Sequence, residues 1–295
     1  MPPEAFQLNR RDLLIVGAAA IAAAGPARAG QIDTAFAAME AAVGGRLGLY
    51  AQEWGGDQIV AYRAGERFLM CSTFKALAVA AILARVDKGQ ERLDRWIAYG
   101  HEDLQEYAPT AKANLPKGGM TLGDLCAAAI ELSDNTAANL IIAELGGPGG
   151  VTRFVRSLGD QTTRLDRNEP TLNRPGALGD PHDTTTPASM VGLWRRLLLQ
   201  DALSHTSRER LADWLEACQT GANRLKAVTP PGWTIGHKTG WGATIIADVA
   251  ILTPPDRRPI LIAAYLEAPD ALDHPHDQVL AEAGRRALQF LTQNA

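Results

Sequence analysis

Segments rich in strand-forming residues occur near both ends of the chain, and a long stretch with helical periodicity separates them. "RLGLYAQ" and "DQIVAYR" precede this stretch, and "GWTIGHKTG", "TIIADVAIL" and "PILIAAYLEA" follow it. Between about residues 72 and 218, apolar residues recur at helical spacing and are interrupted by Gly and Pro. Each strand group alone is too small to enclose a core, so the sequence predicts one antiparallel sheet assembled from both ends. Terminal helices flank this sheet, and an all-helical lobe is inserted into it.

This arrangement is an α/β (α+β) fold with a discontinuous first domain. We expect the α/β domain to comprise residues 30–66 and 219–295, and the all-helical domain to comprise residues 67–218, including an active-site loop at residues 164–183. With 295 residues, of which 46% are hydrophobic, the chain has enough apolar material for the core of one large domain or two small ones. A cleft is expected between the two lobes.

Residues 1–29 have the pattern of an export signal. Arg10 and Arg11 precede a short apolar stretch, and the segment ends in "ARA", a small-x-small pattern after which we expect cleavage at Ala29. The paired arginines indicate the twin-arginine type. The apolar stretch at residues 13–24 is too short to span the ~30 Å of a bilayer core. We therefore expect an exported, periplasmic protein with no stable membrane anchor after signal cleavage.

The charge distribution argues against a nucleic-acid-binding function. The formal net charge is -4, and the basic residues are scattered along the chain. The three cysteines, Cys71, Cys126 and Cys218, are an odd number in apolar contexts, so we expect free thiols, with a Cys71–Cys126 bridge as the alternative. The six histidines show no metal-ligand spacing. We expect no metal, no cofactor, a monomeric chain and a small-molecule ligand.

Ser72 and Lys75 stand three residues apart at the start of the apolar run "FKALAVAAILARV". One helical turn places both side chains on one face, so the amine could receive the hydroxyl proton and make Ser72 a nucleophile. Burying an ammonium group costs several kcal/mol unless it has partners, so such a lysine needs a reason to be there. The structural alternative is a serine N-cap followed by a lysine that extends to solvent.

Three further segments carry polar residues in an order that serine chemistry can use. They are Ser133, Asp134 and Asn135 at a helix boundary, Glu169 and Asn173 in "RNEPTLNR", and Lys238, Thr239 and Gly240 on a predicted strand. Each has a structural explanation of its own, as a turn or N-cap, a solvated loop and a strand end. Together with the first motif, in this order, they arise by chance on the order of once in a hundred thousand sequences or less. The combination therefore favours a catalytic function.

With this motif set the chain resembles the class A β-lactamases over nearly the whole of its mature length. The resemblance includes "RLDR" before Glu169, "DTTTP" at residues 183–187, "GDLC" at residues 123–126, and Tyr107 between the first two motifs. It implies the fold shared by serine β-lactamases and penicillin-binding proteins. It also implies hydrolysis of the β-lactam amide of penicillins through a serine acyl-enzyme, and hence antibiotic resistance.

The resemblance assigns the acylation step to four side chains and two backbone groups. Ser72 is the nucleophile, and either Lys75 or a water held by Glu169 takes its proton, which stays open here. Ser133 passes a proton to the departing lactam nitrogen. The backbone N–H groups of Ser72 and Trp241 form the oxyanion hole, where each donor typically contributes ~3 kcal/mol to the barrier.

Other positions match residues that hold the substrate in this family. Lys238, Thr239 and Gly240 correspond to the motif that binds the substrate carboxylate. Arg224 matches a carboxylate-facing arginine of some members, with an ordinary surface arginine as the alternative. The remaining matches are Asn135, which positions Lys75 and the substrate amide, and Tyr107 at the site.

Glu169 is the residue on which the implied activity depends most. The resemblance implies that Glu169 and Asn173 hold the water that hydrolyses the ester, and that an ion pair of Arg167 with Asp183 closes their loop. The bond between Glu169 and Pro170 is one that can be cis. Two alternatives lack this hydrolytic step: a D,D-peptidase of the penicillin-binding type, and a non-catalytic β-lactam sensor.

Several positions depart from the family pattern. Trp241 replaces a small or hydroxyl residue, so a large ring crowds the edge of the substrate site. Asn168 replaces an often aromatic residue, and the loop at residues 173–183 is about one residue longer than usual. His237 stands where Asp is usual. Gly242 occupies the place of a cysteine that pairs with the equivalent of Cys71 in some members, so that disulfide is excluded here.

Overall fold

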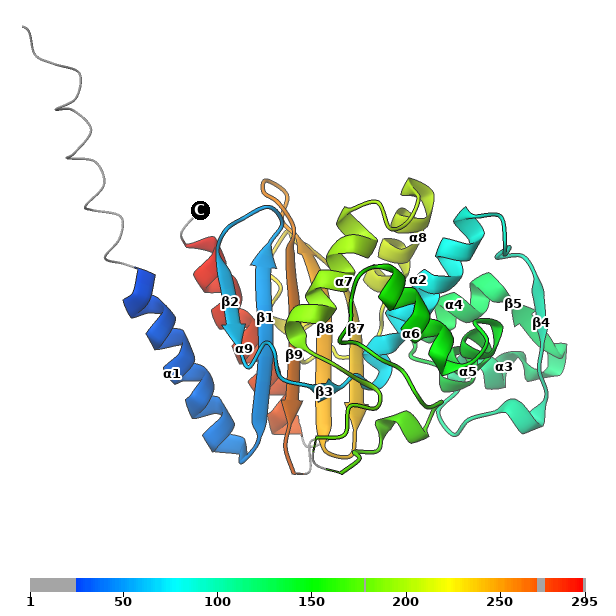
Figure 1. Cartoon of the computed structure of the whole chain (residues 1–295), viewed down its shortest axis with the longest axis horizontal. Helices are drawn as coiled ribbons and strands as arrows, with labels where there is room; N and C mark the ends of the chain where they lie inside the picture. Colours follow the sequence, from blue (N-terminus) through cyan, green and yellow to red (C-terminus); the bar gives the residue numbers. More distant parts are fainter. Residues whose placement is uncertain (1–24, 178, 270–273, 294–295) are drawn as a thin grey trace, which may run out of the picture.

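Strands from the two ends of the chain pair in one five-stranded antiparallel sheet, in the order β2-β1-β9-β8-β7 (Figure 1). They are β1 (Arg46–Glu53), β2 (Ile59–Tyr62), β7 (Thr234–Gly242), β8 (Ile245–Thr253) and β9 (Ile260–Glu267). The N-terminal hairpin joins the C-terminal strands through β1 and β9, where Tyr50 lies opposite Ala263. The predicted sheet built from both ends is confirmed, and β7 forms one of its two edges.

The computed structural model describes residues 25–293 except residue 178 and residues 270–273, and it describes no side chains at residues 25–31, 274 and 275. Arg10 and Arg11, on which the predicted export signal depends, lie outside the described residues. Within the described part of the chain, no helix combines the length and the hydropathy that a membrane span requires.

Both faces of the sheet are buried, and alternate residues of one strand belong to different cores. On β8, Ile246 and Ala250 pack in one core, whereas Ala247 and Val249 pack in the other. This period of two follows from the pleat of the strand. The first core is closed by helices α1 (Gly25–Val43) and α9 (His274–Thr292), which supply Phe36 among other residues. The second core lies between the sheet and the remaining helices.

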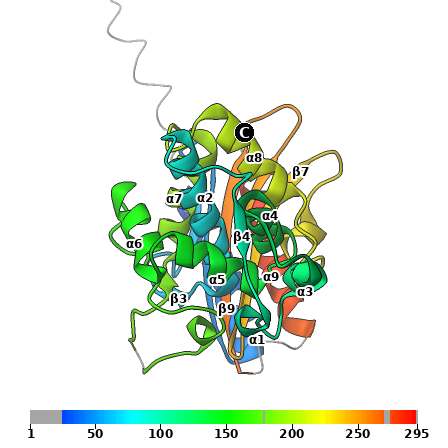
Figure 2. The same cartoon turned by 90° about the vertical axis from the view of Figure 1, so that its right-hand side faces the viewer.

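Figure 1 shows these remaining helices beyond the β7 edge and over the second face of the sheet. They are α2 (Phe74–Asp87), α3 (Pro109–Asn114), α4 (Leu122–Glu131), α5 (Asn135–Glu144), α6 (Pro148–Ser157), α7 (Pro187–Leu199) and α8 (His205–Glu216). Single 3₁₀ turns cover Cys71–Thr73, His101–Asp103, Leu115–Lys117, Thr171–Asn173 and Leu225–Val228. Figure 2 shows α2 among them, with α4 and α5 at its side.

Helix α2 is apolar on all sides because it lies inside the second core. Every residue from Phe74 to Ala84 is buried. Such a helix is expected only in the interior of a protein or in a membrane. Lys75 is the one charged residue of this buried run, and its side chain is fully enclosed.

The chain also contains short strands, at the start of the helical stretch and within it, that the sequence analysis did not predict. β3 (Phe68–Leu69) pairs with β6 (Thr184–Thr185), and β4 (Trp96–Ala98) pairs with β5 (Gly119–Thr121). Strands of two or three residues are too short for an alternating pattern to be recognised. The first pair joins the segment just before the 3₁₀ turn Cys71–Thr73 to the end of the loop that contains Glu169. The division into lobes at residues 66 and 218 stays a prediction.

Asp134 joins two helices at the point where α5 begins. Its Oδ1 accepts a hydrogen bond from the backbone N–H of Ala137 at 2.9 Å, which caps α5. Its Oδ2 accepts from Thr110 N and Ala111 N, both at 2.9 Å, at the start of α3. The side chain is completely buried. A single carboxylate therefore satisfies three backbone donors from two helix N-termini, where a negative charge is also favourable.

We predict that Asp134→Ala lowers the free energy of unfolding by about 3–5 kcal/mol, because three N–H groups lose a charged acceptor. Asp124→Ala is the matched control: Asp124 lies in the first turn of α4, but its bond to Thr121 Oγ1 is exposed. We expect a loss below about 1 kcal/mol for the control. Urea unfolding measures both values, and equal losses in the two variants would contradict this role of Asp134.

Candidate active site

The predicted nucleophile Ser72 lies in the 3₁₀ turn Cys71–Thr73 that leads into α2. The turn begins with a strained backbone, because Cys71 has a φ of 43°, which an L-residue adopts only at a cost. Ser72 is almost buried, with 6% of its surface exposed. The turn packs against β7 at Gly240, where a Cβ atom would lie only 2.8 Å from the Met70 carbonyl oxygen. Gly240 therefore allows the edge strand to approach the nucleophile.

Two buried lysines contact Ser133, which lies in the turn between α4 and α5. Lys75 Nζ donates to the Ser133 carbonyl oxygen at 2.7 Å, to Ser133 Oγ at 3.3 Å and to Asn135 Oδ1 at 2.6 Å. Lys238 Nζ donates to the same Ser133 Oγ at 3.0 Å and to the Thr239 carbonyl oxygen at 3.0 Å. Ser133 has a φ of 58°, a second strained position at the site. Since Ser133 Oγ accepts from both lysines, its own proton is left for another acceptor.

Burial lowers the pKa of both lysines. For Lys75 the loss of hydration outweighs the opposing attraction of Glu169, so its pKa lies below the ordinary value. For Lys238 burial and the charge of Lys75 lower the pKa to about 7, although Cys218 and Asp248 act in the opposite direction. Both amines are therefore easier to deprotonate than an exposed lysine.

Glu169 lies against the nucleophile and the first lysine. Its Oε1 accepts from Ser72 Oγ at 3.3 Å and lies 3.2 Å from Lys75 Nζ. Its Oε2 accepts from Asn173 Nδ2 at 2.6 Å. The Asn173 Oδ1 atom is buried and has no hydrogen-bond partner among the described residues. Lys75 Nζ donates to Ser133 and Asn135 and not to Ser72. The side-chain group that accepts a hydrogen bond from the nucleophile Ser72 is therefore the Glu169 carboxylate.

Asn139 holds the backbone of Glu169 and was missed by the sequence analysis. Its Oδ1 accepts from Glu169 N at 2.9 Å, and its Nδ2 donates to the Glu169 carbonyl oxygen at 3.0 Å. The signal available was its spacing, because Asn139 follows Asn135 by one turn of α5 and so lies on the same face. The bond between Glu169 and Pro170 is cis.

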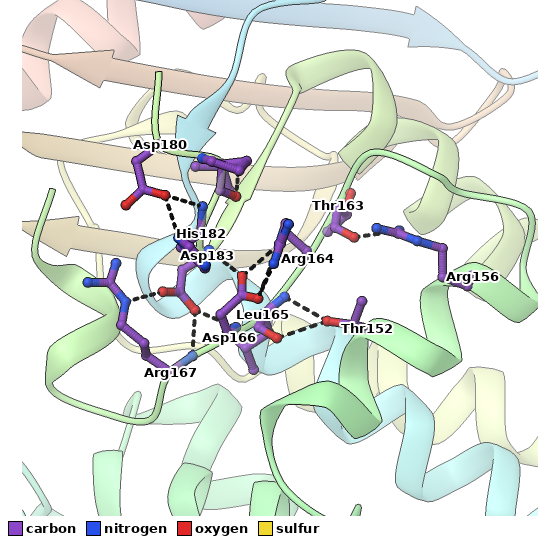
Figure 3. Close-up of polar contacts among 12 residues, drawn as sticks. Thr152, Arg156, Thr163, Arg164, Leu165, Asp166, Arg167, Asp180, His182 and Asp183 are labelled. Atoms are coloured by element: carbon purple, nitrogen blue, oxygen red, sulfur yellow. Dashed lines mark hydrogen bonds and ion pairs between the residues drawn. The ribbon is translucent and has the colours of Figure 1, made fainter. Parts of the chain in front are cut away.

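The loop that carries Glu169 is closed by Asp183 (Figure 3). Asp183 Oδ1 accepts from the backbone N–H of Asp166 at 2.7 Å and of Arg167 at 2.9 Å. Its Oδ2 pairs with the Arg167 side chain, and Asp183 N donates to Asp166 Oδ2 at 3.1 Å. Asp183 is fully buried and has a φ of 57°. The ion pair implied for Arg167 and Asp183 is therefore formed.

A cavity of about 590 Å³ opens over these groups. Its lining includes the predicted site residues Ser72, Tyr107, Ser133, Asn135, Asn173 and Trp241. The rings of Tyr107 and Trp241 meet edge to face with centroids 6.4 Å apart, and they are 39% and 44% exposed. Two aromatic side chains thus flank the opening of the cavity.

Other predicted residues lie behind the cavity wall. Lys75, Glu169, Lys238, Thr239 and Arg224 are buried and are not among its lining residues. Arg224 Nη1 donates to the carbonyl oxygens of Gly240 and Ala247, both at 2.9 Å, and Arg224 Nε pairs with Asp277 at 2.7 Å. Arg224 is therefore not an ordinary surface arginine, since it ties the end of β7 to β8 and α9.

The three cysteines are free, buried thiols. A Cβ atom at Gly242 would lie 3.2 Å from Cys71 Sγ, so the position that holds a cysteine in some relatives adjoins Cys71 here as well. No group of three or more His, Cys, Asp or Glu side chains in the described part of the chain is arranged to hold a metal ion.

Comparison with known proteins gives one answer. Residues 31–291 match the model of the β-lactamase enzyme family. The carbapenem-hydrolyzing β-lactamase KPC of Klebsiella oxytoca is 42% identical over 88% of each chain. The β-lactamase AST-1 of Nocardia asteroides is 44% identical, with 88% of this chain and 83% of that protein covered. The structure of an ancestral class A β-lactamase of Gram-negative bacteria superposes with a TM-score of 0.84 at 50% identity, covering 88% of this chain and all of that one.

The chain belongs to the class A β-lactamases. The fold inferred from the sequence is therefore confirmed. As a serine β-lactamase, the enzyme hydrolyses the β-lactam amide of penicillins and related antibiotics, which gives resistance.

We predict that Asp183→Asn lowers kcat roughly 10- to 100-fold, because an amide N–H would face the Arg167 guanidinium and loosen the loop that positions Glu169. Asp180→Asn is the control on the same loop, since Asp180 is bonded to His182 and not to the segment that leads to Glu169. Steady-state hydrolysis of a penicillin measures both variants. Equal kcat for Asp183→Asn and the parent would refute this account of the loop.

Proposed function

We propose that Ser72 attacks the lactam carbonyl and that Glu169 takes its proton, directly or through one water. The hydrogen bond from Ser72 Oγ to Glu169 Oε1 supports this assignment, because the carboxylate is already the acceptor of the nucleophile's proton. Lys75, whose pKa burial lowers, is the second candidate base. The N–H groups of Ser72 and Trp241 stabilise the oxyanion, and the packing of β7 against the catalytic turn supports their pairing.

Ser133 delivers a proton to the lactam nitrogen as the ring opens. Both lysines donate to Ser133 Oγ, which supports a hydroxyl whose own hydrogen points toward the substrate. Two adjacent ammonium groups also stabilise the oxygen as it loses its proton. Asn135 anchors Lys75 at 2.6 Å and offers its amide N–H to the substrate.

Deacylation by Glu169 distinguishes this enzyme from a peptidase, and the geometry around Glu169 is the single observation that carries the proposal. One oxygen of Glu169 contacts Ser72, and the other contacts Asn173. The unpaired, buried Asn173 Oδ1 supplies an acceptor for a water hydrogen beside this carboxylate. A water held by Glu169 and Asn173 would therefore stand next to an ester on Ser72.

The substrate carboxylate is bound at the edge strand by Lys238 and Thr239. Neither side chain lines the cavity, but Lys238 Nζ lies 3.0 Å from Ser133 Oγ, and both Ser133 and Trp241, two residues after Thr239, line it. Gly240 keeps that edge close to Ser72, and Arg224 fixes its carbonyl group. Tyr107 and Trp241 hold the substrate side groups at the cavity opening.

We predict that Glu169→Ala accumulates a covalent penicilloyl adduct on Ser72, visible as a stable mass increase. The parent enzyme should show turnover with no lasting adduct, whereas a D,D-peptidase or a sensor would retain the adduct in the parent as well. Without Glu169, the pKa of Lys75 falls further, so more of the amine is neutral and able to accept the Ser72 proton, and acylation continues. The double variant Ser72→Ala, Glu169→Ala is the control without a nucleophile. Turnover by Glu169→Ala at the parent rate would overturn the assignment of the deacylating water.

We further propose that the enzyme is exported and acts as a monomer. We also propose that its two lobes are divided at residues 66 and 218. The pattern of residues 1–29 supports export by the twin-arginine route to the periplasm, where the antibiotic is met. A relative of 42% identity is named for carbapenem hydrolysis. In some family members the residue equivalent to Cys71 forms a disulfide with a cysteine at the position of Gly242, and this chain has no such disulfide. The proposed substrates are therefore penicillins first.

Replacing Arg10 and Arg11 by lysine should keep the enzyme out of the periplasm and abolish the penicillin resistance of intact cells. Activity in lysates should remain, because neither residue lies in the matched family region. Arg285→Lys with Arg286→Lys, on the exposed side of α9, is the charge-matched control. Resistance that survives in the first variant would disprove the twin-arginine assignment.

A further inference from the structure

A chain of polar groups, all buried except the partly exposed Thr220, leads to Thr239 on the edge strand. It consists of Asp248, His237, Cys218, Thr220 and Thr239. Thr239 Oγ1 lies 2.6 Å from Thr220 Oγ1, and Thr220 Oγ1 lies 3.3 Å from Cys218 Sγ. The catalytic steps proposed above use only Thr239, so the other four residues need an explanation.

His237 and Asp248 form the inner end of this chain. His237 Nδ1 lies 3.1 Å and 3.3 Å from the two Asp248 carboxylate oxygens, and both side chains are fully buried. His237 Nε2 is buried without a hydrogen bond to any described residue, and the ring interacts with Cys218. Burial acts against the charged imidazole, but Asp248 and Cys218 raise the pKa of His237 to about 10. At neutral pH the ring is therefore an imidazolium.

This cation changes the acidity of Cys218. Burial alone would raise the pKa of the thiol, but the interaction with His237 and the charge of Lys238 lower it to about 7. The core thiol Cys126 is a contrast, because burial raises its pKa well above the ordinary range. Cys218 can thus change its protonation state near neutral pH, and Cys126 cannot.

The direction of the two hydroxyl hydrogen bonds depends on that state. Each hydroxyl has one hydrogen to donate. If Thr239 donates to a substrate carboxylate, its bond with Thr220 requires Thr220 to donate, and the bond between Thr220 and Cys218 then requires the Cys218 S–H to donate. If Cys218 is a thiolate, it accepts from Thr220, Thr220 accepts from Thr239, and the Thr239 hydrogen points away from the substrate.

We propose that Cys218 is a positioning residue for substrate binding: as a thiol it directs the Thr220 and Thr239 hydroxyls toward the substrate carboxylate, and as a thiolate it reverses them. The released proton goes to solvent, because the imidazolium is already protonated on both nitrogens. This inference rests on the proposed role of Thr239 in holding the carboxylate.

Several other charged or titratable groups face Cys218 and the hydroxyls it controls. Lys226 Nζ donates to the Cys218 carbonyl oxygen at 3.3 Å, and Tyr107 interacts with the Cys218 charge. Arg224 lies beside the turn that carries Thr220 and stays bonded to Asp277. Lys238 matters most, because its pKa is also about 7 and its charge also attracts the carboxylate. The test must therefore separate Cys218 from Lys238.

The experiment measures KM and kcat for a penicillin at about pH 6 and about pH 8.5, on either side of the ordinary neutral range. In the parent enzyme KM should rise about three- to tenfold at the higher pH, as one hydrogen bond to a carboxylate is lost, with a smaller change in kcat. Cys218→Ser keeps an O–H donor at both pH values, so the KM ratio should fall by about threefold or more. Cys218→Ala has no donor, so its KM should be high already at the lower pH.

Cys126→Ala is the control for loss of a buried thiol and should keep the parent KM ratio. A merely structural role of Cys218 would change KM and kcat without changing the pH ratio. If Cys218→Ser retains the full parent KM ratio, the pH dependence of KM is caused by the titration of Lys238, and the proposal is overturned. Thr239→Ala tests the carboxylate site separately from the role of Cys218. An unchanged KM of Thr239→Ala at the lower pH would refute the carboxylate site at Thr239. A raised KM of Thr239→Ala, together with a parent-like KM ratio in Cys218→Ser, would refute only the role of Cys218.

Discussion

The enclosure of the Lys75 ammonium group is the interaction on which the active site depends. This side chain is fully buried, yet it reaches acceptors on two separate segments: Ser133 and Asn135 at the start of α5, and Glu169 on the loop. An unpaired buried charge is costly, and these acceptors offset part of the cost of enclosing the ammonium group. Lys75 thereby links the nucleophile's helix, the proton relay and the deacylating carboxylate.

Strain is concentrated at the same place. Four described residues other than glycine have positive φ angles, and three of them, Cys71, Ser133 and Asp183, adjoin a segment of the site, whereas Arg63 follows β2. Such conformations persist only when the surroundings determine them, and here the surroundings are buried ion pairs and hydrogen bonds. Asp183 illustrates the point, because its carboxylate holds two backbone N–H groups and the Arg167 side chain at once. Rigidity of this kind keeps a carboxylate in reach of an ester through both halves of the reaction.

Local patterns were sufficient to predict the sheet, because strand composition at both chain ends gave its antiparallel order. The spacing of Ser72 and Lys75 alone was a weak signal, and the roles at the site were predicted from the whole motif set and its resemblance to a family. Short strands such as β4 escaped detection because two or three residues carry no measurable period. Asn139 escaped because its partners are backbone atoms of Glu169, whose position depends on the conformation of a whole loop. Contacts created by register and loop shape are not encoded in any local window.

His237 is the clearest case of a residue whose meaning appears only in three dimensions. The family usually has Asp there, so the substitution exchanges a negative charge for a group that becomes positive, at a position that is fully buried. The register of β7 and β8 supplies the answer, because Thr239 lies opposite Asp248, and Asp248 reaches His237 on the same face of the sheet. The charge of Cys218 raises the pKa of both His237 and Lys238, and these two residues in turn lower the pKa of the Cys218 thiol. The protonation of the three residues is therefore coupled, and replacing one of them shifts the pKa values of the other two.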